Sequence, residues 1–440
     1  MPLIQPLLDG AYSTVTDGHG VFLVDSEGRR YLDGCSGAVT AGLGHGLEEI
    51  VEVMADQARR VAFSYRLQFR NQPAEDLAAL LEELAPGDIR WTFFVNSGSE
   101  ATETAQKMAV QYWREAGRPE KTVVLSRRLS YHGITLGALS LSGHHTRRSL
   151  FEPLLSPSAV VAPPYCYRCP LGLTYPDCHL ACADDLQRHI DRLGGGTVAA
   201  FAAEPVIGAA GGAIVPPPGY FQRVREICDR NEVLLIADEV MTAMGRTGKM
   251  FAMEHWGVAP DLIALGKGVS AGYTPLAAAL ASDRLVQTIR AGSGVIMSGH
   301  TYSGNPLSCA VGLAVVRYVR KHELARRAAD LGRGLGERLR ALQARHPLVG
   351  DVRGLGLMWG LELVADPAAC TPFSANARVT ARLVAAAQER GLLIYPALTG
   401  ADAGPGDAVI VAPPLTIGKD ELDLLCDLLE QSLTALERTL

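Results

Sequence analysis

The chain has 440 residues, of which 48% are hydrophobic and 20% are charged, a composition typical of a globular protein with more than one domain. Its formal net charge of −6 argues against binding to nucleic acid or to an acidic membrane. No apolar run is long enough for a transmembrane helix, and residues 1–6 lack the basic and apolar regions of a signal peptide, so we expect a cytoplasmic protein. The odd number of cysteines, nine, does not indicate a secreted disulfide framework.

The N-terminal part predicts a β-hairpin over residues 21–34, with its turn at Ser26-Glu27-Gly28. A glycine-rich loop follows over 35–46. Apolar periodicity then predicts helices over 47–62 and 72–85.

The first candidate site follows the predicted strand at residues 91–95. The segment Ser97-Gly98-Ser99 leads directly into a long predicted helix. Free backbone N–H groups and hydroxyls meet at such a helix start, which favours an anion. Simple capping of the helix by Ser97 or Ser99 explains the same residues equally well.

A second predicted strand, at residues 121–125, leads to Tyr131 and His132. A tyrosine beside a strand-end loop either stacks on a planar ligand or packs against the protein. His132 is either a base or a structural histidine.

Residues 163–182 form a cysteine-rich insertion with the spacing C-x2-C-x8-C-x3-C. Four thiolates, with His179 as a substitute ligand, would suit zinc, and a disulfide is a further alternative. The second pair is loosely spaced, and free buried cysteines are the favoured interpretation, so we predict no metal site. The cysteines concerned are Cys166, Cys169, Cys178 and Cys182.

Strands and helices alternate through the middle of the chain. A predicted strand at 198–203 ends at Glu204, and helix 220–231 leads to the apolar run 233–237, which ends at Asp238. This alternation with short loops predicts an α/β fold with a mainly parallel, doubly wound sheet.

The next short apolar run, residues 262–265, ends in Gly266-Lys267. Asp238 and Lys267 therefore both follow buried strands, at the edge where open α/β sheets bind ligands. A strand-end salt bridge is the simplest interpretation. The alternative is pyridoxal phosphate, because this cofactor requires a nucleophilic lysine and a carboxylate that keeps its pyridine nitrogen protonated.

The C-terminal part alternates as well. Strands are predicted near residues 350–365, 392–396 and 408–411, and helices over 374–390 and 418–438. This pattern predicts a small α/β domain.

We expect three divisions of the chain: residues 1–60 as the N-terminal part of that small domain, 61–325 as a large cofactor-binding domain, and 326–440 as the C-terminal part of the small domain.

The ordered motifs make the sequence similar to class III (subgroup II) aminotransferases of the fold type I pyridoxal-phosphate enzymes. The resemblance covers nearly the whole chain. It rests on FFVNSGSEATETAQKMA (93–109), YHGIT (131–135), EPVIGAAGG (204–212), LLIADEVMTAMGRTG (234–248), HWGVAPDLIALGKG (255–268), GHTYSGNPLSCA (299–310) and DVRGLGLMWGLELV (351–364).

The resemblance implies a role for each matching position. Lys267 resembles the lysine that forms a Schiff base with pyridoxal phosphate, and Asp238 resembles the partner of the pyridine nitrogen. The remaining positions assigned to the cofactor are Gly98 and Ser99 at the phosphate, Tyr131 and Val240 on the ring faces, Thr301 from the neighbouring subunit, and Ser97, His132 and Glu204. A site shared in this way implies a homodimer, or a tetramer built from dimers.

Three departures from the family pattern bear on the substrate. Ile134 and Ile410 stand where members that use 2-oxoglutarate carry arginines, and Ala209 stands where they carry a glutamate. We therefore expect a more apolar site that resembles the ω-amino acid or amine:pyruvate branch, with a small-molecule amine donor and an oxo-acid or aldehyde acceptor. Arg66 and Arg70 are then the candidates for binding a substrate carboxylate.

The sequence thus predicts a pyridoxal-phosphate aminotransferase with ping-pong kinetics. A racemase or epimerase of amino acids or amino-lactams, a decarboxylase and an aminomutase are alternatives on the same fold. A non-catalytic scaffold is disfavoured because Lys267, Asp238, Ser99 and Thr301 are all present.

Overall fold

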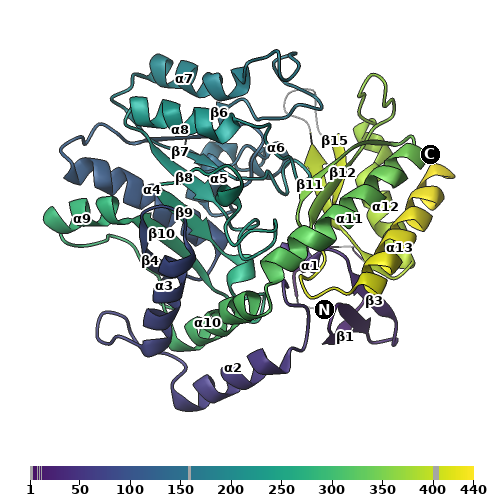
Figure 1. Ribbon diagram of the computed structural model, residues 1–440, viewed down its shortest axis with the longest axis horizontal. Coiled ribbons are helices and arrows are strands. Elements are labelled where there is room, and N and C mark those ends of the chain that lie inside the picture. The colour runs from purple at the N-terminus through teal and green to yellow at the C-terminus, as the bar shows by residue number, and fades with distance from the viewer. Residues whose placement is uncertain (1–2, 7, 9, 11, 157–159, 400–405) are drawn as a thin grey trace.

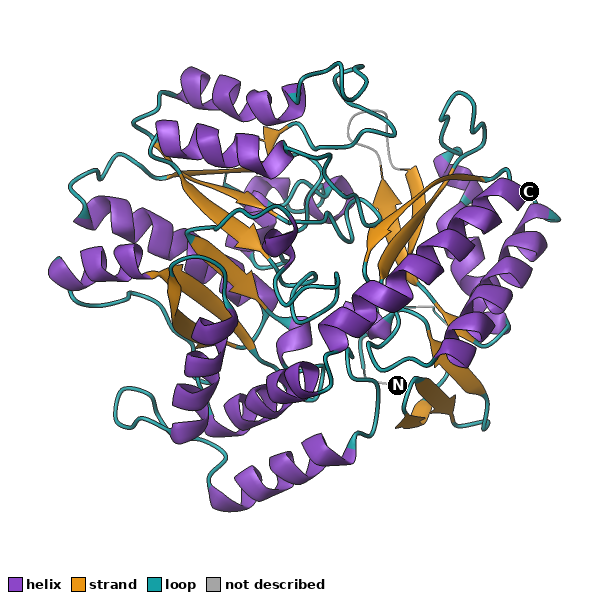
Figure 2. Ribbon diagram, in the orientation of Figure 1, coloured by secondary structure: helices purple, strands orange, loops and turns teal. Residues whose placement is uncertain are grey.

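The structure is a computed structural model that describes residues 3–6, 8, 10, 12–156, 160–399 and 406–440. A larger part is built around a central sheet, and a smaller part contains the N-terminal strands together with the C-terminal helices (Figure 1). Helices surround the central sheet of the larger part, and the C-terminal helices lie beside the strands of the smaller part (Figure 2). In the described residues, no helix is long and apolar enough to cross a membrane.

The central sheet has seven strands in the order β4-β10-β9-β8-β7-β5-β6. Neighbouring strands are parallel except where β10 pairs with β4 and with β9. Their bounds are β4 Ile89–Val95, β5 Val123–Arg127, β6 Val160–Val161, β7 Val198–Ala203, β8 Leu234–Asp238, β9 Leu262–Leu265 and β10 Ala277–Ser282. The mainly parallel sheet predicted from the sequence is confirmed.

Helices cover both faces of this sheet. On one face, Leu235 and Ile263 pack in a core with α3 (Gln72–Leu84), α7 (Ala181–Leu193), α8 (Tyr220–Arg230) and α10 (Pro306–Lys321). On the other face, Leu234 and Ile236 pack with α4 (Gly98–Glu115), α5 (Leu136–Leu141) and α9 (Asp283–Ala291). Because successive strand residues point to opposite faces, an all-apolar strand such as β8 is buried on both sides.

The C-terminal part contains a four-stranded antiparallel sheet in the order β11-β12-β15-β14. Its strands are β11 Val349–Leu355, β12 Met358–Leu363, β14 Tyr395–Thr399 and β15 Gly406–Val411. The helices α11 (Leu324–Arg345), α12 (Val379–Glu389) and α13 (Lys419–Glu437) share one apolar core with it. Helix α12 begins later than predicted, because Arg378 adopts a left-handed conformation (φ +48°) after the short 3-10 turn Ala375–Ala377.

The N-terminal segment joins the C-terminal part in a third sheet. Strands β1 (Val15–His19), β2 (Phe22–Asp25) and β3 (Arg30–Asp33) are antiparallel, and β13 (Leu392–Leu393) pairs parallel to β3. The predicted hairpin is therefore present as β2–β3. The remaining elements are α1 (Ser36–Val39), α2 (Glu48–Arg60), α6 (His145–Arg148), and the 3-10 turns Glu152–Leu154, Ala252–His255 and Lys267–Val269.

The cysteine-rich segment holds free thiols, as do the other cysteines of the chain. Cys182 is buried at the start of α7, and burial raises the pKa of its thiol to about 12, so that it stays protonated near neutral pH. Among the described residues, no group of three or more metal-ligating side chains is placed to hold an ion. The zinc and disulfide interpretations therefore have no geometric support in this part of the chain.

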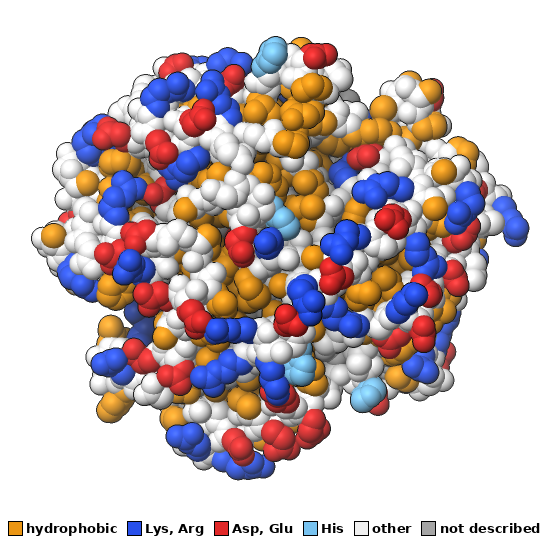
Figure 3. Space-filling view, viewed as in Figure 1, with side chains coloured by type: hydrophobic (Ala, Val, Ile, Leu, Met, Phe, Trp, Pro, Cys, Tyr) orange, Lys and Arg blue, Asp and Glu red, His pale blue; other side chains and the backbone are white. Residues whose placement is uncertain are grey.

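The surface carries both signs of charge. On the face drawn in Figure 3, basic and acidic side chains are interspersed, with apolar side chains between them. Such a mixture provides no extended basic patch on this face, in agreement with the small net charge.

Candidate active site

Four parallel strands of the central sheet deliver the site residues to one place. Asp238 ends β8, Lys267 follows β9, Glu204 follows β7, and Tyr131 lies beyond β5. Because parallel strands have their carboxyl ends at the same edge, these side chains meet there. They border one cavity of about 150 Å³, which is lined by Gly98, Ser99, Tyr131, His132, Gly133, Glu204, Asp238, Val240, Met241 and Lys267.

Lys267 adopts the left-handed conformation (φ +44°) immediately after Gly266. A non-glycine residue is seldom stable in this region, so the surrounding structure must hold it there. Burial lowers the pKa of the Lys267 amine to about 8, although the carboxylates of Asp238 and Glu204 act in the opposite direction. An amine with this pKa is partly neutral at physiological pH and can attack a carbonyl carbon.

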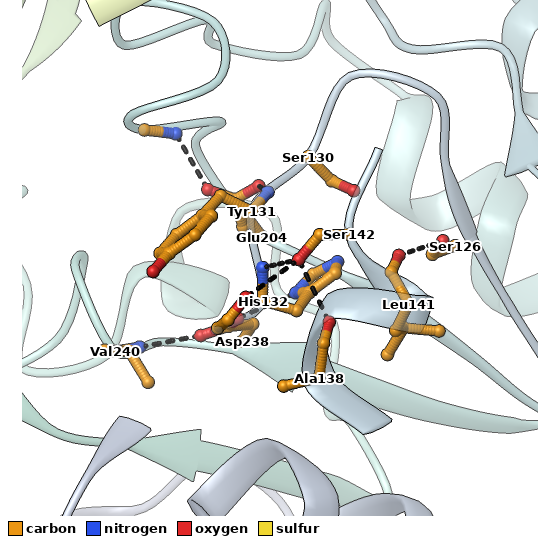
Figure 4. A network of polar contacts seen from close by, with 12 residues as sticks. Ser126, Ser130, Tyr131, His132, Ala138, Leu141, Ser142, Glu204, Asp238 and Val240 are labelled. Atoms are coloured by element: carbon orange, nitrogen blue, oxygen red, sulfur yellow. Dashed lines mark hydrogen bonds and ion pairs between the residues drawn. The ribbon is translucent and has the colours of Figure 1, made fainter. Parts of the chain in front are cut away.

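Asp238 is buried and held on both carboxylate oxygens. One oxygen accepts a hydrogen bond from the Val240 backbone N–H at 3.1 Å. The other lies 2.7 Å from Nδ1 of His132, which is buried as well (Figure 4). His132 is itself held by its backbone N–H, which donates to the Ser142 hydroxyl at 2.8 Å. These contacts fix the orientation of the carboxylate before any ligand arrives.

Glu239, the next residue, has a structural role. Its fully buried carboxylate accepts hydrogen bonds from the backbone N–H groups of Ala252 and Met253, both at 2.9 Å, and from the Thr242 hydroxyl. Burial raises the pKa of Glu239 to about 7. Of the two adjacent acids at the end of β8, only Asp238 lines the cavity.

Glu204 connects two loops of the site. Its carboxylate accepts from the Tyr131 backbone N–H at 3.0 Å and from the Gly208 N–H at 2.8 Å. Burial raises the pKa of this carboxyl. The Tyr131 ring lies edge-on to His144 at 6.1 Å, and the Arg147 guanidinium lies over it, 4.7 Å from the ring centroid.

The start of α4 forms another wall of the cavity. Ser97 caps the helix by accepting from the Glu100 N–H at 3.3 Å, and Ser99 accepts from the Ile134 N–H at 3.0 Å. Within the described residues, the backbone N–H groups of Gly98 and Ser99 have no acceptor. A Cβ on Gly98 would lie 2.8 Å from Val240, so glycine permits this close approach. Free N–H donors at a helix N-terminus suit a phosphate group.

The predicted residues Ser97 and Thr301 do not line this cavity. Ser97 is used as the helix cap, and Thr301 is exposed in the loop before α10. Arg66 donates to the Ser298 carbonyl and Arg70 pairs with Glu75, and both arginines lie outside the cavity lining.

Sequence reasoning did not single out Met241, Gly133 or Arg147. Met241 and Gly133 line the cavity, and Arg147 contacts it through Tyr131. Met241 and Gly133 each follow a predicted residue in the sequence, and this adjacency is the only sequence signal that could have found them. Nothing local marks Arg147.

The cavity fits a planar heteroaromatic phosphate. A protein cavity of about 150 Å³ accommodates a six-membered ring. A carboxylate (Asp238), an amine (Lys267) and two unpaired backbone N–H groups (Gly98 and Ser99) border this space, and a ring between Tyr131 and Val240 would contact a side chain on each face. These are the donors and acceptors that pyridoxal phosphate requires.

Comparison with known proteins agrees with this geometry. The family model described as Aminotransferase class-III matches residues 9–433. The Bacillus subtilis (strain 168) protein named uncharacterized aminotransferase YodT is 48% identical over 438 residues, which cover 100% of this chain and 98% of that protein. The adenosylmethionine-8-amino-7-oxononanoate aminotransferase of Geobacter sulfurreducens is 40% identical over 424 residues, covering 95% of this chain and 91% of the relative. A PLP-bound amine transaminase structure from an uncultivated Pseudomonas species has a TM-score of 0.92 at 36% identity, covering 99% of each chain.

The chain belongs to the class III aminotransferases, and its fold is that of the fold type I pyridoxal-phosphate enzymes. It is a pyridoxal-phosphate-dependent transaminase. The fold, enzyme class and cofactor predicted from the sequence are confirmed.

Proposed function

We propose that this transaminase moves an amino group from an amine or an amino acid to a small oxo-acid or aldehyde in a ping-pong cycle. The observation that carries the proposal is the meeting of the Lys267 amine and the Asp238 carboxylate at one cavity, from the neighbouring strands β9 and β8. Pyridoxal phosphate supplies the electron sink for the reaction.

The residues of the chain supply attack, proton transfer and binding. Lys267, as a partly neutral amine, holds the cofactor and then carries a proton to and from the substrate carbon. Asp238 accepts the pyridine N–H, and the contact with His132 keeps its carboxylate in place. In the same proposal, Tyr131 and Val240 pack on the ring faces of the cofactor, and the Gly98 and Ser99 amides donate to its phosphate. Glu204 holds the loop that carries Tyr131, and Ser97 orients the start of α4.

The substrate side is proposed to be apolar. Met241, which lines the cavity, belongs to a buried cluster with Ile410 and Ala412 of the C-terminal part. Ala209 is buried, and its carbonyl accepts from the Leu398 N–H. No residue of this wall is charged, which supports an acceptor smaller and less anionic than 2-oxoglutarate. The similarity to an amine transaminase and the names of the relatives reported above support transamination and lend no support to racemisation.

We also propose a homodimer in which Thr301 completes the site of the partner. Exposed apolar side chains gather in the two segments 61–70 and 295–302, at Phe63, Leu67, Phe69, Met297 and Tyr302. Contiguous exposed apolar surface of this kind marks an interface. We further propose a division of the chain at residues 60 and 325 into a large domain and a two-part small domain. We also propose a cytoplasmic location, where thiols stay free.

The test is the substitution Lys267→Ala, with Lys321→Ala as the control because Lys321 is exposed and paired with Glu49. We expect the Lys267→Ala variant to lose the visible absorbance of the bound cofactor and to lose transamination at least about 1,000-fold, as for other nucleophile deletions. Incubation of the wild type with an amino donor alone distinguishes the alternatives, because a transaminase accumulates the aminated cofactor and a racemase does not. An unchanged absorbance in Lys267→Ala would refute the proposal.

A further inference from the structure

Two adjacent arginines of α6 have different surroundings. Arg148 donates to the carbonyls of Leu139, Ser140 and Ser142 and pairs with Glu152, so its guanidinium is used to hold the backbone. Arg147 is exposed and forms no ion pair within the described residues. A cation without an acidic partner at the border of an active site is available to a ligand.

The Arg147 guanidinium is held at the cavity by two tyrosines. It lies 4.7 Å from the centroid of the Tyr131 ring, which lines the cavity, and it is close enough to Tyr395 of β14 to lower the pKa of that hydroxyl, against the larger opposite effect of burial. A guanidinium that stacks through its flat face keeps its N–H groups directed outward in its own plane. No acid of the described residues pairs with this guanidinium, so its donors are available to the carboxylate of a ligand.

The field of Arg147 reaches the reactive amine. Its charge is one of the causes that lower the pKa of Lys267. His144, which is in edge-on contact with the Tyr131 ring, has its pKa lowered to about 4, chiefly by burial, and is neutral near pH 7. Arg147 is therefore a permanent cation at the border of the cavity, while the positions of Ile134, Ala209 and Ile410 carry no charge.

We propose that Arg147, positioned by Tyr131 and Tyr395, binds the carboxylate of an amino-acid donor or oxo-acid acceptor and so determines the substrate class. This inference rests on the proposed function and extends it. A planar guanidinium can donate two parallel hydrogen bonds to a carboxylate. Arg147 reaches the site from α6, whereas the family arginines discussed above would stand at positions 134 and 410.

The experiment compares substrates with and without a carboxylate. A series of ω-amino carboxylates of increasing length, each matched with the alkylamine of the same length, is mixed with the holoenzyme, and kcat/KM is obtained from conversion of the cofactor to its aminated form. For Arg147→Gln we expect kcat/KM to fall about 10- to 100-fold for the carboxylates, the range for loss of a charge-assisted hydrogen bond, and to change less than about threefold for the alkylamines. Arg147→Lys should recover part of the loss, because lysine keeps the charge but not the planar donor pair.

The control is Arg333→Gln, which removes an exposed arginine paired with Asp330 on α11. We expect it to leave both substrate series unchanged. Tyr395→Phe should weaken carboxylate selectivity, with a smaller effect than Arg147→Gln. Equal losses for the two series, or no loss in either, would refute the role of Arg147. A fall in pyridoxal phosphate affinity in Arg147→Gln would assign the arginine to the cofactor and refute it as well.

A binding measurement separates this inference from the proposed function. Titration of the holoenzyme with the unreactive carboxylate pentanoate, followed by calorimetry, requires no turnover. We expect wild type to bind it about tenfold or more tightly than Arg147→Gln does. If no donor aminates the cofactor but this difference persists, the proposed function fails and the carboxylate site stands. If donors are converted and pentanoate binding is absent or unaffected by the substitution, the carboxylate site fails alone.

Discussion

The reactivity of Lys267 follows from where its amine is placed. The residue is half-buried at the end of an all-apolar strand, and loss of hydration disfavours its charged form. With a pKa of about 8, roughly one amine in ten is neutral at pH 7, compared with fewer than about one in a thousand for an unperturbed lysine. The fold thus prepares Lys267 for its proposed role as the nucleophile before the cofactor binds.

This placement predicts the pH dependence of cofactor uptake. In the cofactor-free protein, the rate of recombination with pyridoxal phosphate should rise with pH as Lys267 loses its proton, with a midpoint near 8 rather than 10.5. The rate is measured by stopped-flow absorbance, with the Lys267→Ala rate subtracted as background. The rate for Nα-acetyl-lysine in the same buffers is first divided by the neutral fraction of that amine, and division of the protein rate by this corrected rate removes the ionisation of pyridoxal phosphate itself. A midpoint near 10.5 would show that burial does not activate the lysine.

At the residue scale, the sequence predicted what lies at strand ends and missed what comes from tertiary packing. Lys267 and Asp238 were predicted because each directly follows a buried apolar run, and parallel strands bring their carboxyl ends together. Arg147 and Tyr395 are far apart in the chain and belong to different sheets or helices, so no local pattern indicates their contact. The same applies to the contact between His132 and Asp238, although both residues were predicted.

At the scale of elements, a buried charged cluster joins the cysteine-rich segment to the C-terminal sheet. Glu362 of β12 is fully buried and lies 2.7 Å from both Arg168 and Arg353. Its carboxylate also accepts from the Tyr165 hydroxyl, and the pKa of Tyr165 is raised, chiefly by burial. The Arg353 guanidinium also donates hydrogen bonds to the carbonyls of Gly211 and Gly212, which lie in the loop after Glu204. The cluster therefore links three separate segments around the site.

Removal of the acid that pairs with both arginines of this cluster should be costly. Glu362→Gln leaves Arg168 without a carboxylate and leaves Arg353 with Asp351 alone, and we expect a loss of about 3 kcal/mol in the free energy of unfolding. The control Asp330→Asn breaks a surface pair with Arg333 and should cost less than about 1 kcal/mol. Both are measured by urea denaturation at one protein concentration. Equal stabilities of the two variants would show that the cluster contributes no more than a surface pair.

Most elements were predicted where periodicity is strong, as in α3, α4, α8 and the strands β4, β5, β7, β8 and β9. Two features were not. The sequence gives no sign that β10 runs antiparallel between β4 and β9, because strand order is set by long-range packing. The cysteine-rich segment suggested a metal site from its spacing alone, whereas its contacts with the C-terminal sheet come from Tyr165 and Arg168, whose chemistry is not specific in sequence.

At the scale of the whole molecule, we propose that two chains together complete each site. Thr301 lies outside the cavity, in a loop flanked by the exposed side chains of Met297 and Tyr302. In a two-fold dimer each chain presents the same surface, so a loop that reaches the partner's site is matched by one that arrives from the partner. The proposed dimer thus explains why an exposed loop carries apolar residues next to a hydroxyl.

Disruption of the apolar surface should separate the subunits. Leu67→Glu places a charge in the segment 61–70 at a leucine that is 70% exposed, and we expect this variant to be a monomer. Its affinity for pyridoxal phosphate should be at least about tenfold weaker, because the partner no longer supplies donor groups at the phosphate. Leu424→Glu, at an exposed leucine of α13, is the matched control and should remain dimeric. Sedimentation velocity gives the mass of each variant. A monomeric wild type, or a dimeric Leu67→Glu variant with normal cofactor affinity, would contradict the proposed interface.

Sharing of the site can be tested by mixing two defective chains. Lys267→Ala removes the lysine of its own site, and Thr301→Ala removes a phosphate donor from the site of the partner. In a mixed dimer, the site with intact Lys267 receives intact Thr301 from the other chain, so one site of two is whole. Unfolding and refolding the two variants together in equal amounts should give mixed dimers as half of the product. Because one of the two sites in each mixed dimer is whole, about a quarter of the wild-type sites should be restored. Activity is assayed at a low cofactor concentration that leaves Thr301→Ala alone inactive. If Thr301 served its own chain, the whole sites would never form, and the mixture would show no activity beyond that of the separate variants.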